Sequence, residues 1–110
     1  MKLARVEEIP PGQTRYFPLE KGPVLLANYE GTIYAVSGIC LHKLNPLDGA
    51  AMRGPYLDCP YHHYQYDART GVNYFPQNAF PNDFPHFDIQ LGRLQTFAVE
   101  IRDGEVWVDA

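Results

Sequence analysis

Between Cys40 and His63 the sequence reads CLHKLNPLDGAAMRGPYLDCPYHH, a stretch that holds both cysteines of the chain. It opens with Cys-x-His, at Cys40 and His42, and closes with Cys-x-x-His, at Cys59 and His62. Two thiols and two imidazoles arranged as two mixed pairs can direct four donors at neighbouring metal atoms. A zinc finger groups Cys with Cys and His with His, and a Cys–His protease has a different signature. The spacing therefore predicts a metal centre held by two loops.

The rest of the chain predicts short strands. Glycine and proline interrupt residues 38–75, which favours loops with short strands. Before this stretch, apolar-rich runs at 14–19 and 24–29 are followed by a Glu-Gly turn that predicts a hairpin with 32–36. After it, the alternation from Phe97 to Ile101, an Asp-Gly turn and Val-Trp-Val predict a second hairpin.

Helix is nearly absent from this pattern, because Val6–Ile9 can form at most a single turn before two prolines. The expected fold class is all-β. A chain of 110 residues with 45% hydrophobic residues suits one globular domain and leaves a small core.

Charge and hydropathy exclude some functions. The net charge of −4 offers no basic stripe to phosphates, so we expect no nucleic-acid partner. No apolar run approaches the roughly 18 residues of a membrane span. The first residues show no export signal, so the expected location is the cytoplasm, where a cysteine pair is more often metal-binding or catalytic than a disulfide.

The paired motifs resemble the Rieske family, whose ligand loops read C-x-H and C-P-x-H. The resemblance continues through Asn45–Gly49 and through Tyr66–Gly71, which is similar to the family's F/Y-D-x-x-T-G turn. It is strong from Cys40 to Gly71 and holds only in pattern for the flanking strands. It implies one Rieske domain over 1–110. Within it, a basal antiparallel β-sandwich of 1–37 and 76–110 would carry an inserted cluster-binding subdomain of about 38–75.

The resemblance also implies the cofactor and the role. One [2Fe–2S] cluster would be held by Cys40 and Cys59 on one iron and by His42 and His62 on the other. The oxidised cluster with its two thiolates has no net charge, so it accepts an electron more easily than an all-cysteine cluster does. The family suggests a one-electron carrier from a ferredoxin reductase to a terminal oxygenase. Partners would dock over His42 and His62, and the chain would have no catalytic turnover of its own.

Four further residues are expected around the cluster. In the family's high-potential members a serine hydroxyl bonds a bridging sulfide and a tyrosine hydroxyl bonds a ligand sulfur. Tyr64 stands in place of that serine and Tyr66 retains the tyrosine, so one of the two donors remains and we expect a low-to-intermediate potential. Pro46 and Leu47 are expected to shield the cluster from water. His63 stands where the family usually has glycine, which leaves His63 open as a ligand in place of His62 or as a titrating neighbour.

Several alternatives stay open from the residues alone. A structural zinc module would use the same four donors. A small subunit of an assimilatory nitrite reductase, or a cytosolic redox sensor, would share the fold. The segment Phe75–Leu94 predicts either a loop pinned by aromatic side chains, or a partner-docking flap or self-association edge.

Overall fold

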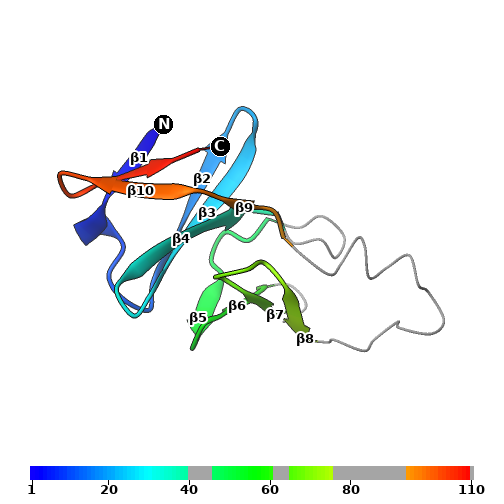
Figure 1. Cartoon of the computed structure of the whole chain (residues 1–110). Coiled ribbons are helices and arrows are strands. Elements are labelled where there is room, and N and C mark those ends of the chain that lie inside the picture. Colours follow the sequence, from blue (N-terminus) through cyan, green and yellow to red (C-terminus); the bar gives the residue numbers. More distant parts are fainter. Residues whose placement is uncertain (40–45, 61–64, 76–93, 110) are drawn as a thin grey trace.

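The structure, a computed structural model, describes residues 1–39, 46–60, 65–75 and 94–109, which form three antiparallel sheets (Figure 1). The terminal sheet has the order β1 (Lys2–Arg5), β11 (Glu105–Val108), β10 (Val99–Arg102). The central sheet has the order β2 (Thr14–Leu19), β3 (Gly22–Tyr29), β4 (Thr32–Ser37), β9 (Thr96–Phe97). The small sheet has the order β5 (Ala51–Arg53), β6 (Tyr56–Asp58), β7 (Gln65–Asp67), β8 (Asn73–Phe75). The all-β prediction is confirmed, and in the described ranges the one helical element is the 3-10 turn η1 (Val6–Glu8).

Strand β3 joins two separate hydrophobic cores because both of its faces are buried. Val24 and Leu26 face a basal core, whereas Leu25 and Ala27 face a second core on the opposite side of the sheet. This double burial explains why β3 is a continuous apolar run instead of an alternating one. The basal core consists of Ala4, Ile9, Val24, Leu26, Ile33, Ala35, Val106 and Val108. The second core consists of Leu25, Ala27, Val36, Leu47, Ala50, Leu57, Cys59, Tyr66, Ala68 and Leu94.

Both predicted hairpins are confirmed, and their turns have the backbone that their residues favour. Glu30 and Gly31 lie at φ 54° and 92° and connect β3 to β4, with Tyr29 paired to Thr32. The Asp103–Gly104 pair lies at φ 51° and 76° and connects β10 to β11. Two successive positive φ values define the tight turn whose twist matches that of the flanking strands.

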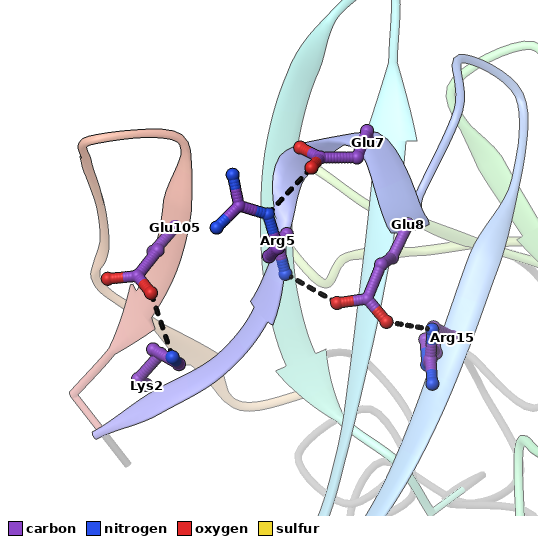
Figure 2. Close-up of polar contacts among 6 residues, drawn as sticks. All are labelled: Lys2, Arg5, Glu7, Glu8, Arg15 and Glu105. Carbon is purple, nitrogen blue, oxygen red and sulfur yellow. Dashed lines mark hydrogen bonds and ion pairs between the residues drawn. The ribbon is translucent and has the colours of Figure 1, made fainter.

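Exposed charged side chains link the first elements of the chain, as Figure 2 shows. Glu8 of η1 accepts the backbone N–H of Arg5 and the guanidinium of Arg15, both at 2.8 Å, so it connects β1 to β2. The Arg5 guanidinium also donates to Glu7 at 2.6 Å and holds the pKa of that carboxyl below its usual value. Water and salt screen exposed pairs of this kind, so they orient η1 more than they stabilise the fold.

The described ranges contain no helix with the length and apolar character needed to cross a membrane. Most of the predicted loop or flap, residues 76–93, lies outside those ranges, and so do four of the predicted site residues, Cys40, His42, His62 and His63.

Candidate metal centre

The first Cys/His segment starts and ends at an isolated antiparallel bridge. Ile39 pairs with Pro46, and the Leu47 N–H donates to the Gly38 carbonyl at 2.7 Å. The two residues that flank residues 40–45, a segment that begins with Cys40, are therefore paired with each other. The base of this segment is fixed to the central sheet.

Gly38 is the residue that allows the chain to lie so close to that sheet. Its N–H donates to the Pro23 carbonyl at 2.8 Å, and a side chain at this position would meet Pro23 and Tyr16 at about 3.0 Å. Cys40 thus follows two residues after a point where the backbone is pressed against β2 and β3. This contact sets the position of the Ile39–Pro46 bridge.

The second Cys/His segment lies between paired strands of the small sheet. Strands β6 and β7 are antiparallel, and their last pair is Asp58 with Gln65. Residues 59–64 begin with Cys59, in the same way that residues 40–45 begin with Cys40 directly after Ile39. Each motif therefore places its cysteine at the first position beyond an antiparallel pair.

Cys59 and Leu47, which lie at the borders of the two segments, belong to one hydrophobic core. The Cys59 thiol is unbridged and fully buried, and Leu47 directly follows the Ile39–Pro46 bridge. Leu47 and Cys59 therefore attach the two segments to the same core. Thiolate and imidazole donors suit zinc or an iron–sulfur cluster, so Cys59 fits the predicted group. No cluster of three or more His, Cys, Asp or Glu side chains forms within the described ranges, which include only this one of the four predicted ligands.

The predicted neighbours of the cluster have different environments. Tyr66, in the middle of β7, is fully buried and packs in the second core with Cys59. Leu47 is also fully buried, whereas Pro46 is exposed. Of the two residues expected to exclude water, Leu47 is the one that the fold buries.

Asp58, which belongs to none of the predicted motifs, is only 5% exposed and directly precedes Cys59. Arg53 donates to it from β5, with Nε 2.6 Å from Oδ2. The sequence motifs gave no signal for this ion pair. The register of the β5–β6 hairpin pairs Arg53 with Tyr56 and Ala51 with Asp58, and so puts both charged residues on one face.

Arg69 connects the small sheet to the central sheet. Its guanidinium donates to both carboxylate oxygens of Asp67, at 3.0 and 2.9 Å, and lies 5.5 Å from the centre of the Tyr29 ring. The hydrogen bond from Arg69 holds the pKa of Asp67 below its usual value, against the opposing effect of partial burial. This contact joins the Tyr66–Gly71 motif to β3.

These observations define a class: a small antiparallel β protein in which each of two Cys/His segments begins directly after an antiparallel residue pair, and in which the second segment begins with a buried thiol. Solved structures share the fold. The ferredoxin of carbazole 1,9a-dioxygenase from Nocardioides aromaticivorans IC177 is 21% identical, with 98% of this chain and 94% of that chain covered and a TM-score of 0.79. The Sphingomonas yanoikuyae B1 ferredoxin is 24% identical, with coverages of 100% and 97% and a TM-score of 0.79.

Sequence comparison identifies the family. The sequence model described as the Rieske [2Fe-2S] domain matches residues 1–97, so the chain belongs to the Rieske [2Fe–2S] domain family and its cofactor is a [2Fe–2S] cluster. The ferredoxin CarAc of Metapseudomonas resinovorans is 25% identical over 98% of this chain and 91% of its own length. A ferredoxin component of naphthalene 1,2-dioxygenase/salicylate 5-hydroxylase systems from a Ralstonia species is 28% identical over 62% of this chain, and the match spans 65% of that relative.

Proposed function

We propose that this chain is a Rieske-type ferredoxin, a one-electron carrier that serves a terminal oxygenase and has no catalytic turnover of its own. The observation that carries the proposal is the position of the two cysteines. Ile39 pairs with Pro46 and Asp58 pairs with Gln65, and in each pair the first residue is directly followed by a cysteine. The names of the relatives support the role, because CarAc and the Ralstonia protein are ferredoxins or ferredoxin components of oxygenase systems.

Four side chains hold the cluster in this proposal. Cys40 and Cys59 bind one iron, and His42 and His62 bind the other, with His63 as the neighbour of a ligand. The bound cluster supplies the uptake and release of a single electron. The chain is one domain over 1–110, in which 38–75 form the cluster-binding subdomain and 1–37 with 76–110 form the basal part. Support comes from β3, whose two faces serve two separate cores.

The protein around these ligands keeps water away and orients them. Leu47 covers the cluster from within the second core, to which Cys59 also belongs, and Pro46 shields the cluster from its place in the bridge with Ile39. The Tyr66 hydroxyl donates a hydrogen bond to a ligand sulfur. A donor to sulfur stabilises the more negative, reduced state, so Tyr66 raises the potential within a low-to-intermediate range.

Electrons enter from a ferredoxin reductase and leave to the oxygenase, both of which dock over His42 and His62. One solved structure with this fold is a complex of reduced oxygenase and oxidised ferredoxin of carbazole 1,9a-dioxygenase, at 22% identity and a TM-score of 0.80. The net charge of −4 favours a basic docking face on the partner. The proposed location is the cytoplasm, where the two thiols stay reduced for metal binding.

The test is spectroscopy of the purified protein before and after dithionite. A red-brown protein that bleaches and gives a rhombic electron paramagnetic resonance signal, with an average g value below that of all-cysteine clusters, is the expected result. A colourless protein with bound zinc would overturn the proposal. His62→Ala and His63→Ala then form a matched pair: loss of the signal is expected for His62→Ala and retention for His63→Ala.

A further inference from the structure

We infer that Arg53 and Asp58 form a charge pair that sets the reduction potential of the centre, with Asp58 lowering the potential and Arg53 raising it. The inference rests on the proposed ligation by Cys59. It concerns two residues outside the ligand motifs, one of them on the far strand of the β5–β6 hairpin.

The chain puts an acidic residue directly before the ligand. Asp58 directly precedes Cys59, so their Cα atoms are about 3.8 Å apart. Asp58 is 5% exposed, and Cys59 is fully buried. Side chains alternate along β6, so Leu57 lies in the second core while Asp58 lies on the face that also carries Arg53.

Burial makes the Asp58 charge effective at this range. A charge separated from the cluster by protein is screened far less than one surrounded by water. Reduction adds one negative charge to the cluster. The Asp58 carboxylate therefore opposes reduction, and the fold keeps that charge buried by giving it the Arg53 guanidinium at 2.6 Å.

Arg53 compensates this charge only in part. Its side chain is 64% exposed, against 6% for that of Asp58, so water and salt screen the guanidinium more than the carboxylate. The two charges therefore do not cancel at the cluster. At high ionic strength the Asp58 charge has the larger effect on the reduction potential. A purely structural ion pair would not produce effects of opposite sign.

The experiment measures the midpoint potential by protein-film voltammetry in the full-length, cluster-loaded protein. Asp58→Asn is expected to raise the potential and Arg53→Gln to lower it. Each shift corresponds to about a tenfold change in the equilibrium constant for reduction, which is about 59 mV for one electron. The double variant is expected between the two single variants. Added salt is expected to reduce the Arg53→Gln shift more than the Asp58→Asn shift. Arg53→Lys keeps the positive charge, so its midpoint potential is expected to stay close to that of the parent protein.

Matched controls come from the pair Glu100 and Arg102 on β10, whose charges are exposed and belong to the terminal sheet. Glu100→Gln and Arg102→Gln change the net charge equally and are expected to leave the potential unchanged. If the two site variants shift the potential in the same direction, or no further than these controls, the inference is overturned.

Iron and sulfide content and the resonance spectrum of each variant keep this result separate from the proposed function. Loss of the signal in Cys59→Ala, which has no donor atom at this position, with retention in Asp58→Asn and Arg53→Gln shows that the ligand assignment holds, whatever the potentials show. A full signal in Cys59→Ala would overturn the ligation and the charge-pair inference together. If Asp58→Asn fails to fold, the exposed Arg53→Gln variant alone still decides the sign of the effect.

Discussion

The backbones of Gly71 and Leu94 lie in direct contact: the Leu94 N–H donates to the Gly71 carbonyl at 2.6 Å, and a methyl group on Gly71 would collide with the Leu94 carbonyl oxygen. Gly71 follows β7 at φ +79°, and Leu94 precedes β9 of the central sheet. This contact joins the small sheet to the returning chain. Only glycine satisfies both the backbone angle and the lack of space.

Gly71→Ala is therefore expected to destabilise the protein by about 2–4 kcal/mol, since a positive φ and an overlap with backbone act together. Urea unfolding of the loaded protein measures the loss. Gly49→Ala is the control, because Gly49 also has a positive φ, +87°, but its Cβ would meet open space. It should lose only about 1–2 kcal/mol. Equal losses in the two variants would show that the Leu94 contact is unimportant.

Asn28, which is 3% exposed, connects three parts of the basal region. Its Nδ2 donates to the Ile9 carbonyl at 2.7 Å, and its Oδ1 accepts the Gly31 N–H at 2.8 Å. Asn28→Ala leaves both backbone groups without this partner, so we expect a loss of about 2–3 kcal/mol in the free energy of unfolding. Gln13→Ala removes an exposed amide nearby and should change stability by less than about 0.5 kcal/mol. A small effect at Asn28 would mean that water replaces the amide.

Tyr66→Phe tests the hydroxyl assigned to a ligand sulfur. Removal of one hydrogen bond worth about 0.5–1.5 kcal/mol is expected to lower the midpoint potential by about 20–65 mV. Voltammetry provides the measurement. Tyr34→Phe, on β4 of the central sheet, serves as the control and should leave the potential unchanged. An unaltered potential in Tyr66→Phe would assign the Tyr66 ring to packing alone.

The pKa of Asp67 depends on Arg69. In the folded protein this pKa lies below the usual value of about 3.9, because Arg69 stabilises the ionised form. The pair therefore contributes stability above about pH 4, and that contribution is lost as the pH falls through the lowered pKa. Arg69→Gln should raise the pKa of Asp67 toward about 3.9. Carboxyl-carbon NMR titration measures it, with Arg102→Gln as the control. A pKa of Asp67 that stays low in Arg69→Gln would assign the lowering to another group.

Local patterns predicted much of the fold because hairpins depend on local chemistry. The Glu30–Gly31 and Asp103–Gly104 turns have the positive φ values that their residues tolerate, and the flanking strands were predicted to within about two residues. The metal motif was also readable from the sequence, since ligand type and spacing are chemical requirements. The pairing of β1 with β11 was not, because it joins the two ends of the chain.

Local chemistry thus predicted strand β2, the two hairpins with their turns, and the family to which the Cys/His spacing belongs, whereas β1 was not predicted. The tertiary structure decided which side chains become buried. Leu47 is buried and Pro46 exposed, although the two are adjacent, and Asp58 is buried as an ion pair beside Cys59. Burial depends on contacts between segments distant along the chain, such as the second core formed by β3, β6 and β7. No local pattern contains those contacts, because they exist only once the three sheets pack together.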